Sequence, residues 1–471
     1  MPGTFFGLES AVRSLRAQQT AVDVVNHNIA NANTPGYSRQ EAVMAAATPY
    51  TVPAVNRDPS AGQVGTGVEV TRIRRTRDSF VDYQLRNELA TMGRWEAARD
   101  SFQQVESVLN EPSTSGINTL LSRFWQSWEE LANAPSDGAV RASLVEQGKA
   151  LATAIGYAYQ QLGKFAQDAD LQIRLTVDDV NSIADRLAAL NAQVAQVELS
   201  GQQANDLTDE RDLLLDQLSR QTKVAVAIAP NGMAQVFMGN RLLVDGSSAR
   251  HLQAVTTMPY GLAEVQWASD GEPANVTGGS LRGLLDQRGD TAQTTGVLPD
   301  LKAKLDGIAS DLISAVNGQH VQGFGLDDAG STPPGRLFFA GSGAADIAVA
   351  GDVADNPRNV AAASQAGAPG DSSNAIAIVR ALSGSGVSAK YQALIAGLGV
   401  QTRTASETVD NQDVLVRHLQ RRREALSGVS LDEETVNLLK YQQAYEASAR
   451  VITAVDQMLD TLINQTGVVG R

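Results

Sequence analysis

The chain has 471 residues with 52 acidic and 38 basic side chains, and its formal net charge of -14 argues against a nucleic-acid-binding surface and favours protein partners. This length exceeds what a single hydrophobic core organises, and it predicts about two to four domains. Cysteine is absent, which excludes disulfides, thiolate metal sites and cysteine nucleophiles.

The first predicted element is an amphipathic helix that should stop by Thr34. It carries a narrow apolar row with a seven-residue repeat, Leu8, Leu15, Val22 and Ile29. Such a row on an otherwise polar helix predicts packing along another helix. The first residues, MPGTFFGLESAVRSL, lack the basic segment and apolar run of a cleaved secretory signal, and no stretch is long enough to span a membrane. We therefore expect the protein to stay in the cytoplasm or to leave by a route without a cleaved signal.

An asparagine-rich segment follows and ends in Pro35-Gly36. This pair fits the central positions of a type II turn, and the proline biases Thr34 away from helix. The extended residues after the turn, with the run GTGVEV at 65–70, predict a β-rich excursion. Helix is expected to resume near Thr76.

From there to about Ser219 the pattern is mostly helical, with breaks at 111–116 and 134–138. The longest helix is expected at about 168–199, where most apolar residues fall on one face: Leu171, Val177, Val180, Ile183, Leu187, Leu190, Val194 and Val197. This part of the chain predicts a helical bundle or a coiled-coil rod.

The pattern changes at Lys223, where valine and isoleucine alternate with alanine up to an Asn231-Gly232 turn. Further turn signals at 239–240 and 245–246 complete a predicted small β-meander. Helix returns at about 298–316, and the Gly-, Ala-, Ser- and Asp-rich region up to about 370 predicts a second, irregular β-containing module.

Helix dominates again from Ala375, and the capping box Ser430-Leu-Asp-Glu433 predicts the start of the last helix. This helix carries two apolar rows in the same register. The first row is Leu431, Leu438, Tyr445, Ile452 and Leu459, and the second is Tyr441, Ser448, Val455 and Leu462. Two such rows form the seam of a coiled coil.

These elements predict a mainly α fold with inserted β modules. The N- and C-terminal helices pair in a coiled coil, a long-helix rod follows, and smaller β-containing outer domains lie at the far tip. The expected divisions are 1–75 for the N-terminal part of the terminal coiled-coil domain with its extended excursion, 76–222 for the rod, 223–297 for the small β module, 298–374 for the outer module of helix and irregular β structure, 375–428 for the returning rod helices, and 429–471 for the C-terminal coiled-coil helix.

The acidic run Asp206, Asp209, Glu210, Asp212 and Asp216 is the one candidate for acid–base catalysis or divalent-cation binding. Leucines interleave with these residues, so we interpret the run as the solvated side of an amphipathic helix. The histidines, His27, His251, His320 and His418, are too far apart for a helical or ribbon metal motif. The glycine-rich runs lack a P-loop lysine. We therefore predict no catalytic, cofactor-binding or metal-binding residue and expect a protein that is not an enzyme.

Two arginine clusters lie near the expected junction of end helices and rod. They comprise Arg72, Arg74, Arg75 and Arg77, and Arg417, Arg421, Arg422 and Arg423. A nucleic acid is one alternative partner for them. The acidic total and the nearby Asp432, Glu433 and Glu434 favour salt bridges within or between subunits, each worth about 0 to 1 kcal/mol when exposed.

Residues 15–40, with the core NHNIANANTPGYSRQ, resemble the N-terminal signature of the bacterial flagellar rod, hook and hook-associated protein family. The motif residues are Asn26, Asn28, Asn31, Asn33, Thr34, Pro35, Gly36, Tyr37, Ser38, Arg39 and Gln40. Residues 430–450 resemble the other half of that signature, in the form typical of hook-associated members. Residues 205–219, NDLTDERDLLLDQLS, are similar to a motif of the helical domain of those members, whereas hook and rod proteins have mostly β middles or none.

The resemblance implies a secreted structural subunit of the extracellular flagellum, located at the hook-to-filament junction, with its terminal helices lining the central channel. It also implies unfolded export by the flagellar type III apparatus. The implied partners are further copies of the chain in a ring or helical zone, the hook protein, a second junction protein (hook-associated protein 3) and a cytoplasmic export chaperone, with no nucleic acid and no membrane. The expected assembly seam comprises Leu8, Leu15, Val22, Ile29, Leu431, Leu438, Tyr441, Tyr445, Ile452, Val455, Leu459 and Leu462.

Two other hypotheses stay open at this point. The first is another axial subunit, a hook or rod protein, against which the helical middle argues. The second is an enzyme such as a wall hydrolase that uses the acidic run.

Overall fold

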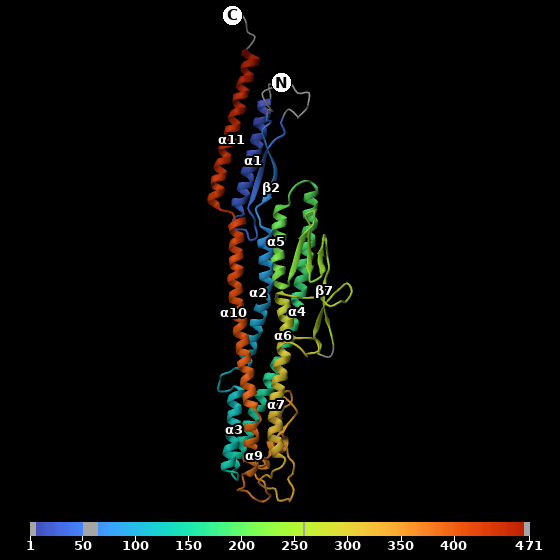
Figure 1. Cartoon of the computed structure of the whole chain (residues 1–471), viewed down its shortest axis with the longest axis vertical. Helices are drawn as coiled ribbons and strands as arrows, with labels where there is room; N and C mark the ends of the chain where they lie inside the picture. Colours follow the sequence, from blue (N-terminus) through green and yellow to red (C-terminus); the bar gives the residue numbers. More distant parts are fainter. Residues whose placement is uncertain (1–5, 50–64, 258–259, 466–471) are drawn as a thin grey trace.

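The structure, a computed structural model, describes residues 6–49, 65–257 and 260–465. It forms a long rod with most helices running along its axis and with both ends of the chain at the same end of the rod (Figure 1). There, α1 (Phe6–Ala30) lies beside α11 (Leu431–Asp460), and the hairpin of β1 (Gln40–Ala46) and β2 (Val68–Arg75) packs against α1. The predicted pairing of the terminal helices is confirmed.

The rod is built from α2 (Ser79–Leu109), α3 (Ile117–Asn133), α4 (Gly138–Leu199), α5 (Asn205–Gln221) and α10 (Val387–Ser427). Its breaks fall where proline and glycine predict them. The predicted start of the longest helix near 168 is wrong, because α4 is one continuous helix of 62 residues.

Two apolar cores share α4 and explain its length. The distal core contains residues from the first half of α4, up to Ala166, and from α3, α7 (Val297–His320) and α9 (Ser373–Gly384). The proximal core contains residues from the second half of α4, from Ile173 onward, and from α5, α6 (Gly279–Arg288) and the β-sheet described below. Leu171 lies between the cores and is 57% exposed, so it does not share the buried face that most of the predicted apolar residues form.

The predicted β-meander is a four-stranded antiparallel sheet in the order β3 (Val224–Ile228), β4 (Ala234–Met238), β5 (Arg241–Asp245) and β6 (Ser248–Ala249). A second hairpin, β7 (Leu252–Thr256) with β8 (Ala263–Trp267), follows it. The buried Asn191 of α4 fixes the sheet, because its Nδ2 donates to the Ala234 and Gly246 carbonyls, each at 2.8 Å. The module therefore lies along the proximal half of α4, and its expected place at the far tip is wrong (Figure 1).

The far tip is formed by α3, α9 and the region after α7, which contains β9 (Phe339–Ala340), β10 (Ala348–Val349), α8 (Gly351–Asp355) and a single 3-10 turn (Pro357–Asn359). The loops of this region are organised by the buried His320. Its Nε2 accepts from the Ala361 amide at 2.9 Å, so its Nδ1 donates to the Arg336 carbonyl at 2.7 Å. Burial lowers the pKa of His320 to about 4, so the ring holds both loops in its neutral form at pH 7.

Candidate functional site

The sequence motif at 26–40 lies where the terminal helices meet the rod. We call this place the joint, and it comprises residues 26–40, 73–86, 205–216 and 423–434. Three connections cross it: the motif itself, the link from β2 to α2, and the link from α10 to α11. Any force passed between the terminal helices and the rod therefore passes through this group of residues.

A tight turn reverses the chain after α1. The Tyr37 amide donates to the Thr34 carbonyl at 3.2 Å across Pro35 and Gly36. Gly36 has φ +85, the left-handed backbone conformation that position i+2 of a type II turn requires. The predicted turn is confirmed, and it directs the chain from Ser38 to Gln40 onto α5.

Asn28 ties the pieces of the joint together and is 1% exposed. Its Nδ2 donates to the Gln40 carbonyl at 2.9 Å and to Glu434 Oε2 at 3.0 Å. Its Oδ1 accepts from the Tyr37 hydroxyl at 2.8 Å and from the Gln40 amide at 2.9 Å. All four hydrogen-bonding positions of the amide are used, so a single side chain connects α1, the turn, β1 and α11.

The residues after the turn bind the N-terminal half of α5. Ser38 donates twice to the Asp209 carboxylate, from its amide at 2.9 Å and from its hydroxyl at 2.7 Å. Gln40 Nε2 donates to Asp206 at 2.7 Å, and its Oε1 accepts from Asn205 at 3.0 Å. The motif thus recognises the residues Asn205 to Asp209, which belong to the second sequence motif.

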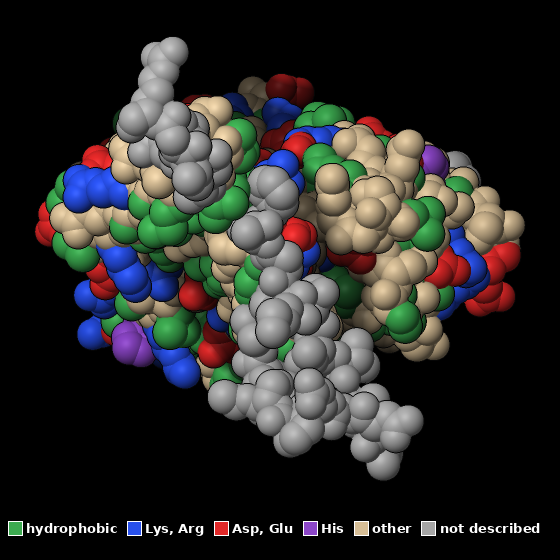
Figure 2. Space-filling model, turned by 90° about the horizontal axis from the view of Figure 1, so that it is seen from above, with side chains coloured by type: hydrophobic (Ala, Val, Ile, Leu, Met, Phe, Trp, Pro, Cys, Tyr) green, Lys and Arg blue, Asp and Glu red, His purple; other side chains and the backbone are tan. Residues whose placement is uncertain are grey.

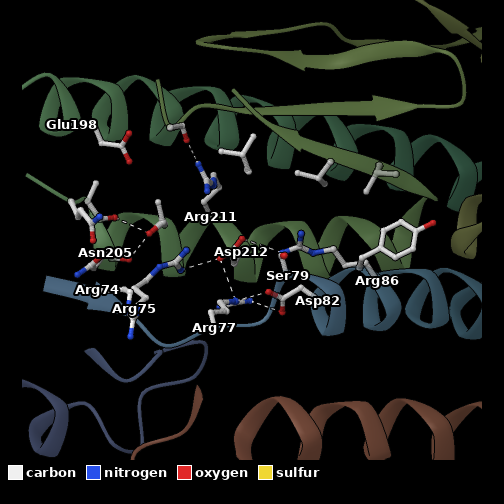
Figure 3. Close-up of a pocket in the computed structure, with 18 residues that line it drawn as sticks. Arg74, Arg75, Arg77, Ser79, Asp82, Arg86, Glu198, Asn205, Arg211 and Asp212 are labelled. Carbon is white, nitrogen blue, oxygen red and sulfur yellow. Dashed lines mark hydrogen bonds and ion pairs between the residues drawn. The ribbon is translucent and has the colours of Figure 1, made fainter. Parts of the chain in front are cut away.

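Arginines from two other segments complete the joint (Figure 3). Arg75 lies 2.6 Å from Asp209 and 3.0 Å from Asp212. Arg86 reaches the other oxygen of Asp212 at 3.1 Å. Arg77 is also enclosed, and it binds Asp82 with two hydrogen bonds of 2.7 and 3.0 Å.

One more carboxylate connects the joint to the last rod helix. Asp216 of α5 accepts from Arg86 at 3.0 Å and also pairs with Arg423 of α10. Since α10 continues into α11, this pair fixes the approach to the terminal helix. The joint is consequently a closed network of alternating charges.

The charges of this network stabilise one another. Burial acts to raise the pKa of Asp212, but Arg77, Arg86 and Arg75 outweigh it and lower the pKa to about 2. Burial likewise acts to lower the pKa of Arg77, and the surrounding carboxylates raise it instead. Burial and the nearby carboxylates raise the pKa of Tyr37, which keeps its hydroxyl proton for Asn28.

The interpretation of the acidic run as a solvated face is wrong for three of its five members. Asp209, Asp212 and Asp216 are buried, whereas Asp206 and Glu210 are exposed. The buried face of α5 is covered by arginines that lie more than a hundred residues away in sequence. No group of three or more acidic or histidine side chains in the described residues is arranged to hold a metal ion.

The two arginine clusters divide between the joint and the surface. Arg75, Arg77 and Arg423 belong to the network above. Arg74 pairs with Glu41 of the hairpin at 3.0 Å, and Arg417 pairs with Asp413 of its own helix at 2.9 Å. The remaining members are exposed, namely Arg72, Arg421 and Arg422.

The acidic residues at 432–434 do not form salt bridges with the two arginine clusters, although the sequence suggested that they would. Glu433 pairs with Arg39 of the motif at 2.7 Å, and the buried Glu434 accepts from Asn28. The carboxylates that neutralise the clusters come mostly from α5. The N-cap of α11 forms as predicted, because the Ser430 hydroxyl accepts from the Glu433 amide.

The remaining motif residues hold the end of α1. Asn31 Nδ2 donates to the His27 carbonyl at 3.1 Å, and the Thr34 hydroxyl donates to Asn31 Oδ1 at 3.1 Å. Asn26 and Asn33 are exposed, and so is Pro35. These positions leave the outer side of the turn open.

The seam residues lie at the edges of the contact between α1 and α11. The most buried face of α1 is lined by Ala11, Ala17, Ala21, Val24, Val25 and Asn28. The predicted row Leu8, Leu15, Val22 and Ile29 is half-buried beside this face. On α11 the half-buried seam residues are Leu438, Tyr441, Ile452, Val455 and Leu459, and the exposed ones are Leu431, Tyr445 and Leu462.

Two residues of the joint, Asp82 and Arg86, were not singled out from the sequence, and Glu434 was predicted only as a salt-bridge partner of the arginine clusters. Each is a charged residue among others on an amphipathic helix, and its local pattern is that of a surface position.

Comparisons with known proteins agree along the whole chain. Residues 102–339 match the family described as flagellar hook-associated protein FlgK helical domain. Residues 8–37 match the flagella basal body rod protein family, and residues 424–465 match the flagellar basal body rod FlgEFG protein C-terminal family.

The chain is 33% identical to flagellar hook-associated protein 1 of Bacillus subtilis, with all of both chains covered. It is 26% identical to the protein of the same name from Escherichia coli, over 97% of this chain and 99% of that one. A solved structure, the flagellar hook junction protein FlgK from Burkholderia pseudomallei, is 26% identical with a TM-score of 0.47, over 55% of this chain and 46% of that one. In the described part of the chain, no helix has the length and apolar character needed to cross a membrane.

Proposed function

The chain belongs to the flagellar hook-associated protein 1 (FlgK) family, and we propose on that premise that it is a structural subunit connecting hook and filament in the bacterial flagellum. It polymerises through its terminal helices and has no catalytic role. The buried carboxylates of α5 support the non-enzymatic role, because they are neutralised by arginines rather than open to a substrate.

The observation that carries this proposal is the exposure of α11. Over its 30 residues, the one buried side chain is Glu434. Apolar side chains on its outer side are exposed, including Val436, Leu439, Val451 and Met458. Hydrophobic side chains are also visible at the surface when the molecule is viewed from the end that carries the termini (Figure 2).

A helix with so little burial is marginal in water, because helices gain most of their stability from packing. Burying one leucine or isoleucine contributes about 1.5 to 3 kcal/mol. The assembly seam along α1 and α11 therefore gains its partners when neighbouring copies are present, and ordering of the terminal helices accompanies assembly. The alternative of a hook or rod subunit is disfavoured by the match to the helical domain at 102–339.

This coupling predicts weak protection of the terminal helices in the free chain. Amide hydrogen exchange of the monomer should be fast at residues 6–27 and 435–460 and slow in the distal core. The reason is that the terminal helices expose most of one face, whereas side chains such as Trp128 are fully buried. Equal protection in both regions would contradict the coupling.

The proposed partners are other copies of the chain, the hook protein, hook-associated protein 3 and an export chaperone. The proposed location is the extracellular flagellum, reached by type III export. The domain limits at 75/76, 222/223, 297/298, 374/375 and 428/429 remain proposals, supported by the ends of α5 at Gln221 and α10 at Ser427.

Deleting the gene in its host tests the proposal. We expect bare hooks under the electron microscope and flagellin in the culture medium, because filament subunits would leave the cell without a junction to join. A plasmid copy of the gene serves as the control and should restore filaments. Intact filaments in the deletion strain would exclude the junction role. Loss of the hooks would instead indicate that the protein is a hook or rod subunit.

A further inference from the structure

Two cavities lie along the contact between α7 and α10, in the distal half of the rod (Figure 1). The distal cavity, of about 410 Å³, is lined by α7 and α10. The proximal cavity, of about 340 Å³, is lined by α2, α6, the start of α7 and α10, and its apolar side chains are Trp95, Ala98, Phe102, Val297 and Val400. Since both cavities follow the same two helices, they form one mainly apolar groove along residues 297–311 and 390–404. We call it the α7–α10 groove.

Interior glycines of both helices keep this groove open. Gly307 of α7 lines the distal cavity, and Gly397 of α10 lies between the cavities, one turn after Ala393 and one turn before Val400. A Cβ atom added at either glycine would meet no described residue beyond its own helical turn within 4 Å. Glycine lowers the stability of a helix relative to alanine, so a glycine inside a helix calls for a reason in packing or function.

Other helical glycines of the rod have that reason within the chain. A Cβ atom at Gly93 would lie 2.2 Å from the Arg220 carbonyl oxygen, and one at Gly283 would lie 2.4 Å from the Arg94 carbonyl oxygen. These two glycines allow helices of the rod to pack closely on each other. The two groove glycines leave open surface that the described fold does not use, which indicates the close approach of an element from outside the chain.

The proximal cavity also holds an unpaired polar group. Gln287 of α6 is 3% exposed and lines the cavity, and its Oε1 has no hydrogen-bond partner among the described residues. A buried amide oxygen without a donor is unfavourable. The groove therefore fits a helix that brings apolar side chains together with an N–H donor near its proximal end.

The outer side of α4 carries a row of side chains that suits this groove. Tyr157, Leu171 and Leu175 are each more than half exposed. The helical repeat places them on one line, on the side of α4 opposite its buried residues such as Leu162. We call this row the α4 ridge. Because it faces away from the helices that pack on α4, it does not reach the groove of its own chain.

We propose that the α4 ridge of one copy packs into the α7–α10 groove of a second copy lying alongside it. The lengths agree, since the groove and the ridge from Tyr157 to Leu171 each extend about 21 Å at about 1.5 Å per helical residue. The heights also agree, because Lys302 of α7 lies 4.7 Å from the centre of the Tyr159 ring of α4. The inference rests on the proposed function, in which terminal helices that assemble together bring the rods of neighbouring copies side by side.

Copies of the same orientation fix which side chain meets which cavity. Tyr157 enters the distal cavity and Leu171 enters the proximal one, as two apolar anchors. Gln167, which is exposed one turn before Leu171, brings an amide donor to Gln287. Ridge and groove are different surfaces, so the contact is heterologous and repeats from copy to copy around a ring or helical zone.

The absence of cysteine allows a direct test by cross-linking. Asp168→Cys places a thiol on the ridge one turn before Leu171, and Gln401→Cys places one at the margin of the proximal cavity. Both positions are exposed. The doubly substituted chain, expressed in the deletion strain, is treated with a short bismaleimide on isolated hook–filament structures, and the products are separated on a denaturing gel.

Ridge-in-groove packing predicts a ladder of covalent multimers from the doubly substituted chain and no product larger than a dimer from either single variant. The matched control pairs Asp168→Cys with Arg403→Cys. Arg403 is exposed two residues after Gln401, and hence on the other side of α10. This control pair should give no ladder.

Filling the groove tests the role of its glycines. Adding Gly397→Trp should reduce the ladder at least fivefold, whereas Gly399→Trp should leave it unchanged. Gly399 is equally open, but it lies on the other side of α10. Both tryptophan variants should melt at the temperature of the unsubstituted chain, because neither side chain displaces a neighbour. Leu171→Gln changes only the exposed ridge and should reduce the ladder as well, which keeps the test valid if a tryptophan disturbs α10.

The outcomes separate this contact from the junction role. Restored filaments with no ladder, or with an equal ladder from the control pair, would overturn the packing and leave the junction role standing. A ladder insensitive to both Gly397→Trp and Leu171→Gln would overturn the assignment of groove and ridge. Intact filaments in the deletion strain would overturn the junction role itself.

Discussion

Replacing Asp212 with alanine is expected to lower the free energy of unfolding by about 3 kcal/mol, the lower end of the cost of breaking a buried ion pair. Asp212 lies 3.0 Å from Arg75, 3.1 Å from Arg86 and 3.5 Å from Arg77. The substitution leaves three enclosed guanidinium groups with less negative charge around them. Each keeps at least one other carboxylate, which is why the loss stays near the lower limit. Urea unfolding followed by circular dichroism measures the effect.

Glu210→Ala is the matched control, because Glu210 lies on the same helix and is exposed. Its nearest basic partner, Arg186, is 3.6 Å away at the surface, so we expect a change of about 0 to 1 kcal/mol. Equal effects of the two substitutions would mean that the network does not hold the joint.

The acid dependence of stability provides a second measurement on the same pair of variants. The pKa of Asp212 falls from 3.8 to about 2 on folding. Its contribution is therefore fully present above about pH 4 and is lost as the pH falls toward 2. The Asp212→Ala chain should lose less stability across this interval than Glu210→Ala. Parallel curves would contradict the pKa shift.

Local signals predicted much of the fold. The Pro35-Gly36 turn, the cap at Ser430 and the alternation at Val224 to Ile228 are properties of a few neighbouring residues, and each appears in the structure. The terminal pairing was also predictable, since heptad rows at both ends of a chain favour each other as partners.

The burial of Asp209 and Asp212 was not predictable from the same kind of signal. A carboxylate on an amphipathic helix has the same local pattern whether it faces water or an arginine from another segment. Here the partner Arg75 is 134 residues from Asp209. The buried face of α1 was missed for a related reason, because it is lined by small residues such as Ala21 and not by the leucines that a heptad rule expects.

The second large effect is expected from Asn28→Asp. The substitution replaces the Nδ2 donor by an oxygen. This oxygen then faces the Glu434 carboxylate, at the position of the present 3.0 Å bond, and the Gln40 carbonyl, at the position of the present 2.9 Å bond. Two buried carboxylates side by side repel each other, and Glu434 is only 2% exposed. We expect the start of α11 to detach from α1 at a cost of about 3 to 5 kcal/mol.

Limited proteolysis of α11 measures this detachment, and Asn26→Asp is the matched control. Asn26 is exposed on the same helix two residues earlier, so a negative charge there should leave the cleavage rate unchanged. The distal core is remote from Asn28, and its unfolding should be the same in both variants.

Combining Asn28→Asp with Glu434→Gln tests whether the hydrogen bond between residues 28 and 434 is itself responsible for the detachment. The amide of a glutamine at 434 supplies the donor that the first substitution removed, so the double variant should recover most of the protection of α11. A merely disordered α1 would not be rescued by a change on α11. Recovery would establish that this one hydrogen bond sets where α11 begins to pack, because Glu434 is the single buried side chain of that helix. The remaining residues of α11 are then free to find partners on other copies.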